Sequence, residues 1–270
     1  MAKRNLSNWG ENIVKELGKT SGIVGAFSTL IVAGGVVVSA PAVAIAGGLV
    51  AAGSLVYAAI SGFPAKLVEP NELVGKEVDL KVLNNLSDPI SRLGIIGASE
   101  SGKSTLVKRL ISQPPENVRT SEVYATVFVL QSVPQKYVAL IDGDGSQYYQ
   151  QFKVAEYASS LIILLDHNIS DKKIETNIDR IKEHDNFLYQ LEAILKKDNK
   201  LSSLKYIHFL LNKRDLWENA TDVKTLENWF SDVTTRWKNF GFSIDITSTH
   251  YSNKFPDDLV TLINLISSKI

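Results

Sequence analysis

The stretch GIIGASESGKSTLVKRL, residues 94–110, decides the fold. An apolar run reaches Ile96, where we expect a strand to end, and an amphipathic pattern begins at Lys103, where we expect a helix. The loop between them has the spacing G-x-x-x-x-G-K-S, which lets successive backbone N–H groups turn toward phosphate oxygens. Lys103 adds a positive charge, and the helix N-terminus adds its dipole. The residues predicted to bind phosphate are Gly97, Ser99, Glu100, Ser101, Gly102, Lys103, Ser104 and Thr105.

From residue 90 onward, short apolar runs alternate with longer amphipathic ones, which predicts an α/β fold. Strands are expected at 92–96, 122–131, 136–142, 160–166, 205–211 and 242–247, and helices at 103–112, 150–159, within 171–197, at 222–239 and at 256–269. This pattern predicts a mostly parallel six-stranded sheet with helices on both faces. Only residues 132–135 separate the second and third strands, so one of these two should run antiparallel at the sheet edge.

Three further motifs follow predicted strands. Asp142–Gly145 has the form D-x-x-G, in which Asp142 is positioned to hold Mg²⁺ through water and Gly145 to meet a γ-phosphate. Asn212–Asp215 has the form N-K-x-D, in which a carboxylate at Asp215 accepts two hydrogen bonds from the N1 and N2 edge of guanine. The predicted guanine-nucleotide residues here are Gly145, Asn212, Lys213, Asp215, Ser248 and Thr249. Ser248 and Thr249 are included because they should follow the last strand and present backbone N–H groups to the guanine oxygen.

The composition excludes several classes of protein. Lys and Arg number 29 and Asp and Glu also number 29, so the net charge is zero, which argues against a nucleic-acid partner held by bulk electrostatics. The chain has no cysteine, which excludes disulfides, thiolate metal sites and a cysteine nucleophile.

The N-terminal quarter differs from the rest. Residues 20–65 contain no Asp, Glu, Lys or Arg, and Pro41 divides them into two halves, each close to the roughly 20 residues of one membrane crossing. Before them, Leu6, Trp9, Ile13 and Leu17 recur at helical spacing, typical of an interfacial amphipathic helix.

We therefore expect three segments. Residues 1–65 should form the amphipathic helix and a hydrophobic hairpin that places residues 20–65 in a lipid bilayer. Residues 66–89 should form a linker, and residues 90–270 a nucleotide-binding domain on the cytoplasmic face, because Lys and Arg flank the hairpin. The abundance of glycine leaves open a hairpin that inserts conditionally or self-associates.

In this order, the four motifs resemble the P-loop GTPases of the Ras, Arf and G-protein α superfamily, over about residues 90–270. The phosphate loop looks most like that of G-protein α subunits. A membrane segment followed by a compact GTPase domain is similar in arrangement to the signal recognition particle receptor β subunit. The resemblance implies GTP or GDP and Mg²⁺ as ligands, with Ser104, Asp142 and a switch threonine around the metal.

Carried over to this chain, the resemblance implies roles for Thr120, Lys103 and Gln147. Thr120 precedes the second strand and is expected to close on Mg²⁺, with Thr126 as the alternative. The family has a water-orienting glutamine directly after the D-x-x-G glycine, whereas this chain has Ser146 there and Gln147 one position later. Slow hydrolysis, or hydrolysis that needs a partner, is therefore expected.

The resulting expectation is a membrane-anchored small GTPase that acts as a nucleotide-dependent switch with an unidentified protein effector or regulator. Two alternatives remain open at this stage. One is a receptor or scaffold subunit that holds GTP and hydrolyses little of it. The other is a membrane effector whose hairpin inserts or assembles under nucleotide control.

Overall fold

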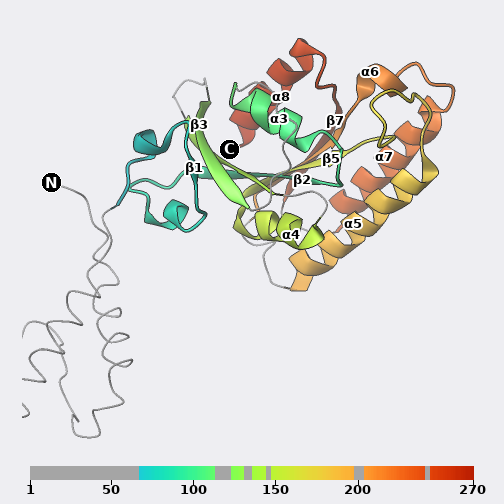
Figure 1. Cartoon of the computed structure of the whole chain (residues 1–270). Coiled ribbons are helices and arrows are strands. Elements are labelled where there is room, and N and C mark those ends of the chain that lie inside the picture. Colours follow the sequence, from blue (N-terminus) through green and yellow to red (C-terminus); the bar gives the residue numbers. More distant parts are fainter. Residues whose placement is uncertain (1–66, 113–122, 131–135, 144–146, 198–203, 241–243) are drawn as a thin grey trace, which may run out of the picture. The chain divides into compact units, whose positions relative to one another are not determined.

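The computed structural model describes residues 67–112, 123–130, 136–143, 147–197, 204–240 and 244–270 (Figure 1). Its strands are β1 (Glu77–Val78), β2 (Ser91–Gly97), β3 (Tyr124–Leu130), β4 (Lys136–Asp142), β5 (Ser160–Leu165), β6 (Tyr206–Leu211) and β7 (Asp245–His250). Its α-helices are α3 (Lys103–Leu110), α4 (Tyr148–Tyr157), α5 (Ile178–Lys197), α6 (Arg214–Trp217), α7 (Val223–Lys238) and α8 (Pro256–Lys269), and two 3₁₀ turns, η2 (Pro70–Leu73) and η3 (Val82–Asn85), precede β2.

The strands form one seven-stranded sheet in the order β1-β3-β4-β2-β5-β6-β7. Strands β4, β2, β5, β6 and β7 run parallel, which confirms the predicted α/β fold with a mostly parallel sheet. As expected from the short connection, β3 is antiparallel to β4. The prediction that this antiparallel strand forms the sheet edge was wrong, because the two-residue strand β1 pairs with β3 on its outer side.

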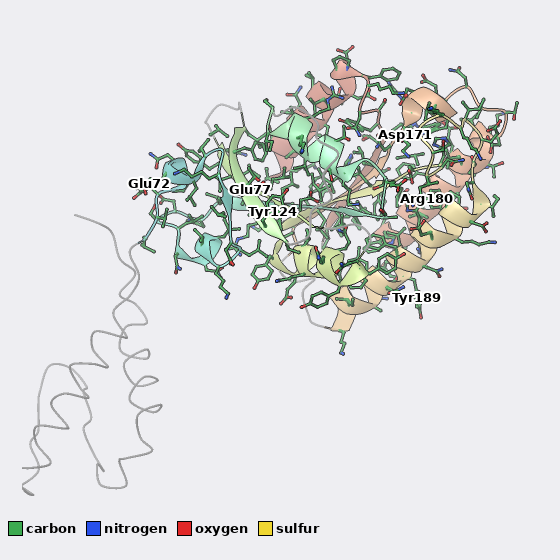
Figure 2. The ribbon with its side chains drawn as sticks, viewed as in Figure 1. Glu72, Glu77, Tyr124, Asp171, Arg180 and Tyr189 are labelled. Carbon is green, nitrogen blue, oxygen red and sulfur yellow. The ribbon has the colours of Figure 1, made fainter. Side chains whose placement is uncertain are left out.

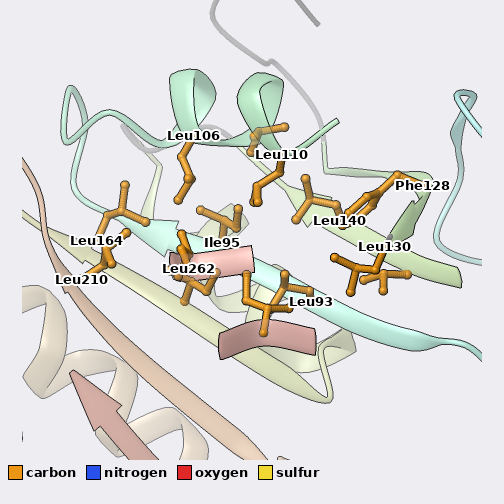
Figure 3. Close-up of a cluster of buried hydrophobic side chains, with 14 of the residues drawn as sticks. Leu93, Ile95, Leu106, Leu110, Phe128, Leu130, Leu140, Leu164, Leu210 and Leu262 are labelled. Atoms are coloured by element: carbon orange, nitrogen blue, oxygen red, sulfur yellow. The ribbon is translucent and has the colours of Figure 1, made fainter. Parts of the chain in front are cut away.

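Helices cover both faces of the sheet, with α3 and α8 on one side and α4 and α5 on the other (Figure 1). Under α3 and α8 lies a cluster of buried side chains that includes Ile95, Leu106, Leu164, Leu210 and Leu262 (Figure 3). Burial of such side chains stabilises the fold by about 1.5–3 kcal/mol each. On the opposite face, α7 packs the Trp237 ring edge-on against Phe209 at 5.4 Å.

The segment before β2 runs along the outer edge of β3. Val74 bridges to Val127, and the Gly75 N–H donates to the Val127 carbonyl at 2.8 Å. Leu80 and Leu83 are buried, so this segment also contributes apolar side chains to the interior. Residues 74–78 therefore supply the backbone partners for part of the outer side of β3.

Across the described residues, no helix has both the length and the apolar character needed to cross a bilayer. The amphipathic helix and hairpin predicted for residues 1–65 lie outside the described part of the chain. The proposed bilayer segment therefore keeps the status of an expectation from sequence.

Candidate functional site

The predicted motifs converge at one end of the sheet. Strand β2 lies between β4 and β5. After β2 the chain forms β3 and β4 on one side of it, and then β5, β6 and β7 on the other side. In open α/β sheets, the crevice beyond the carboxyl ends of the strands at such a switch point is where ligands bind. The loops that follow β2, β4 and β6 contain three of the four predicted motifs. Because these strands are parallel, the described residues of the three motifs lie at this end.

The phosphate loop, Gly97–Gly102, joins β2 to α3 as predicted. Gly102 has φ +94°, and a Cβ there would lie 2.4 Å from the Asn212 Nδ2 atom. Glycine is therefore needed at this position both for its backbone conformation and for space. The Lys103 ammonium donates to the Ala98 carbonyl at 2.8 Å within the same loop. The buried Ser101 Oγ has no hydrogen-bond partner among the described residues, as expected of a loop shaped for a polar ligand.

The start of α3 and the end of β4 carry the predicted metal ligands. Ser104 is the second residue of α3, and Asp142 is the last residue of β4, where it is 1% exposed. Strand β4 is the direct neighbour of β2, so both groups belong to the same end of the sheet. A carboxylate and a hydroxyl are oxygen donors of the kind that Mg²⁺ prefers, so these two residues fit the ion.

A buried glutamine joins the phosphate loop to the D-x-x-G segment. Gln151 of α4 is completely buried. Its Oε1 atom accepts from the Gly97 N–H at 2.9 Å, and its Nε2 atom donates to the Gly143 carbonyl at 3.0 Å. The two segments that would face the phosphates thus share one amide side chain. Nothing in the sequence distinguishes this glutamine from the neighbouring Gln150.

The guanine loop, Asn212–Asp215, follows β6 and is tied to the phosphate loop. The Asn212 Nδ2 group donates to the Ser101 carbonyl at 2.7 Å. In addition, the indole N–H of the buried Trp217 donates to the Asn212 carbonyl at 2.8 Å. The predicted base-contacting loop and the predicted phosphate-binding loop are therefore fixed to each other.

Asp215 lies in an environment that keeps it an acceptor. Ser252 Oγ donates to its Oδ1 atom at 2.5 Å, and Lys254 Nζ lies 2.7 Å from its Oδ2 atom. Partial burial opposes ionisation, but the hydrogen bonds from Lys254 and Ser252 outweigh it and hold the pKa of Asp215 below its ordinary value. Each carboxylate oxygen retains a further lone pair that can accept a hydrogen bond from a ligand.

The last strand differs from its predicted bounds. Ser248 and Thr249 lie inside β7, where they pair with Phe209 and Leu210 of β6, so they do not follow the strand. The Thr249 hydroxyl is 2.9 Å from the His208 Nε2 atom within the sheet. The strand extends through polar residues because β6 provides a complete backbone partner for them.

The loop beyond β7 takes the place that we had predicted for Ser248 and Thr249. Its residues Ser252 and Lys254 hold Asp215, and the Asn253 amide donates to the Gly102 carbonyl at 3.3 Å. This loop therefore contacts both the guanine loop and the phosphate loop. The signal that could have revealed it is the polar sequence Ser252–Lys254, which only Phe255 separates from the helix-starting Pro256.

The remaining predicted residues are less completely described. Thr120 and Gly145 lie outside the described residues. Gln147 is exposed at the N-cap position of α4, where its side chain makes no capping hydrogen bond to the backbone, and its Oε1 atom accepts from the Gln150 amide at 3.4 Å. Glu100 is exposed with φ +61°, and Thr105 is partly buried in the first turn of α3.

Comparisons with known proteins give structural similarity only. No family model and no curated protein matches the chain. Among solved structures, the bacterial selenocysteine-specific elongation factor EF-Sec is similar over 67% of this chain and 28% of its own, with 14% identity and a TM-score of 0.48. A chain of the mammalian SRP receptor is similar over 66% of this chain and 100% of its own, with 17% identity and a TM-score of 0.47. This chain thus spans about a quarter of the length of EF-Sec.

Proposed function

We propose that this protein is a membrane-anchored GTPase that binds GTP with Mg²⁺, acts as a nucleotide-dependent switch and hydrolyses GTP slowly or with a partner. The observation that carries the guanine assignment is the Asp215 carboxylate. It is held ionised by Ser252 and Lys254 in a loop that Asn212 fastens to the phosphate loop. A ligand that spans both loops needs a purine with two adjacent N–H donors and a phosphate tail.

The phosphate loop supports the same ligand. Lys103, the α3 N-terminus and the backbone N–H groups of the loop offer positive potential to a diphosphate or triphosphate. When bound, Mg²⁺ would neutralise phosphate charge, and Ser104 and Asp142 are the described residues that would hold it.

The assignment of guanine is tested by exchanging the carboxylate for an amide. An amide at position 215 donates where the carboxylate accepted, so Asp215→Asn should lose GTP affinity and gain affinity for xanthosine triphosphate. Two charge-assisted hydrogen bonds of about 1.5–3 kcal/mol each predict a loss of GTP affinity of roughly 10²–10⁴-fold. Calorimetric titration with both nucleotides measures the exchange, and Asp257→Asn, an exposed aspartate of α8, is the matched control. Full GTP affinity in Asp215→Asn would refute the guanine assignment.

The rate of hydrolysis separates a switch from a scaffold. Gln147 is exposed at the start of α4 and stands one position later than the family's glutamine, which favours slow turnover. Release of phosphate from bound GTP in a single-turnover assay supports the switch, whereas GTP that stays bound without phosphate release supports a nucleotide-holding receptor subunit. If Gln147→Ala releases phosphate at the wild-type rate, Gln147 does not orient water.

The membrane part of the proposal rests on sequence. The uncharged residues 20–65 motivate a bilayer anchor ahead of the nucleotide-binding domain. The segment expected to be a linker, 66–89, belongs largely to that domain, because β1 pairs with β3 and Leu80 and Leu83 are buried. Membrane fractionation of the full chain, with alkaline extraction, tests the anchor. If the protein is recovered in the supernatant in every nucleotide state, it has no bilayer anchor. In a separate assay, release of vesicle contents only with a non-hydrolysable GTP analogue would favour the membrane-effector alternative.

A further inference from the structure

A buried ion cluster contacts both the phosphate loop and the guanine loop. Asp166, the residue after β5, is fully buried. Its Oδ1 atom lies 2.6 Å from Arg180 Nε and 2.8 Å from His184 Nε2, and its Oδ2 atom lies 2.9 Å from Lys213 Nζ. Burial alone would raise the pKa of Asp166, but His184 and Arg180 outweigh that effect and hold it well below its ordinary value. One buried carboxylate is therefore shared by cations from α5 and from the guanine loop.

Arg180 extends this cluster to the phosphate loop. Its Nη2 group donates to the Ser99 carbonyl at 2.7 Å, and its Nη1 group pairs with Glu183 at 2.7 Å. With Nε on Asp166, all three guanidinium nitrogens have protein acceptors, which fixes the orientation of the group. Figure 2 shows Arg180 near the start of α5, on the same side of the molecule as Asp171. A rigid fork of this kind suits arginine and not lysine, because its donors point in fixed directions.

Lys213 connects the same carboxylate to the guanine loop. Its ammonium also donates to the carbonyls of Asn168 and Ile169 at 2.8 and 3.1 Å and pairs with Asp171 at 3.0 Å. Lys213 has φ +61° and is the residue directly before α6, the short helix that contains Asp215. The Lys213 side chain therefore fastens the guanine loop to Asp166 and to the segment after β5, directly before the helix that contains Asp215.

We propose that Arg180 is a positioning residue for base discrimination, which acts through Asp166 and Lys213 while it holds the Ser99 carbonyl of the phosphate loop. The pathway consists of direct contacts: Ser99 to Arg180, Arg180 to Asp166, and Asp166 to Lys213. Loss of Arg180 leaves the buried Asp166 with altered charge compensation, so Lys213 and the guanine loop shift with it. The inference rests on the proposed guanine-nucleotide binding and adds a residue that does not itself touch the base.

The test measures discrimination between GDP and inosine diphosphate, which lacks the 2-amino group that Asp215 would read. In Arg180→Met, both affinities should fall, and the GDP-to-IDP affinity ratio should fall by about threefold or more, because the guanine loop is displaced. Arg180→Lys keeps a cation beside Asp166 and gives up the fork, so its ratio should recover toward the wild-type value. Lys182→Met, an exposed neighbour on α5 whose ammonium pairs with Asp179, should keep both affinities and the ratio.

The outcomes separate this inference from the proposed function. Wild-type protein that binds neither nucleotide overturns both. Tight GDP binding by the wild type, with an unchanged GDP-to-IDP ratio in Arg180→Met, overturns the role of Arg180 alone, since a residue that only supported the phosphate loop would lower both affinities equally. If the GDP-to-IDP affinity ratio of Arg180→Lys stays as low as that of Arg180→Met, the proposed action of Arg180 through Asp166 and Lys213 is overturned. If Arg180→Met does not fold, the double variant Arg180→Met/Asp166→Asn, which removes both buried charges together, is measured in its place with the same expected fall in the ratio.

Discussion

Gln151 offers a direct test of how the site is held together. In Gln151→Leu, the side-chain volume is nearly kept, but the bonds to the Gly97 N–H and the Gly143 carbonyl are lost. Both backbone groups belong to buried residues, so each is left without its partner at a cost of about 1–3 kcal/mol. The two costs together come to about 2–6 kcal/mol, and the apolar side chain offsets about 1 kcal/mol of that. We therefore expect the free energy of unfolding to fall by about 1–5 kcal/mol.

Urea denaturation followed by circular dichroism measures this change in nucleotide-free protein, so the result does not depend on the proposed ligand. Gln190→Leu, at an exposed position of α5, is the matched control and should change stability by less than about 0.5 kcal/mol. Gln151→Glu keeps an acceptor for the Gly97 N–H but loses the donor to Gly143 and buries a charge, so it should be at least as destabilised. A Gln151→Leu protein as stable as the Gln190→Leu control would refute the account of this bridge.

Two further predictions concern conformation and pH. Gly102→Ala should weaken nucleotide binding at least about tenfold and lower the free energy of unfolding by about 1–3 kcal/mol, because the backbone has φ +94° and the new Cβ would displace the Asn212 amide. Nucleotide titration measures the first effect and urea denaturation the second. A variant with unchanged affinity and stability would contradict the described loop geometry. Burial lowers the pKa of His208 from 6.5 to about 4. As the pH falls, this histidine is therefore protonated in the unfolded chain at a higher pH than in the folded protein. The free energy of unfolding should decline as pH falls from 6.5 toward 4, by about 3 kcal/mol in total. His208→Gln should lose correspondingly less stability across that pH window, and equal losses in the two proteins would rule out His208 as the group responsible.

Most of the fold could be predicted because its strands are long apolar runs. Strand β4, for example, has the predicted bounds Lys136–Asp142, and α8 has the predicted bounds Pro256–Lys269. Strand β7 was misplaced because Thr247, Ser248 and Thr249 are polar and only partly buried. Pairing with β6 decides their conformation, and pairing is a tertiary property that local polarity does not reveal.

The candidate site was predictable only in its loops. The spacing of Gly97, Gly102 and Lys103 is local, so the sequence contains it. The cluster of Asp166, Arg180 and Lys213 joins residues from the end of β5, from α5 and from the guanine loop, and Asp166 is the residue directly after the strand. Each of these residues alone is an ordinary charged side chain. Only the folded sheet brings them together, and their burial then makes the contacts specific.

The strip of residues 74–78 has a practical consequence for anyone who shortens this protein. A protein that began at Ile90 would keep every motif of the site but would remove the backbone that pairs with Ala125, Thr126 and Val127 on β3. An apolar strand with open hydrogen-bonding groups recruits other chains, so such a fragment should self-associate into β-rich aggregates. A start before Glu69 would retain the protective strip.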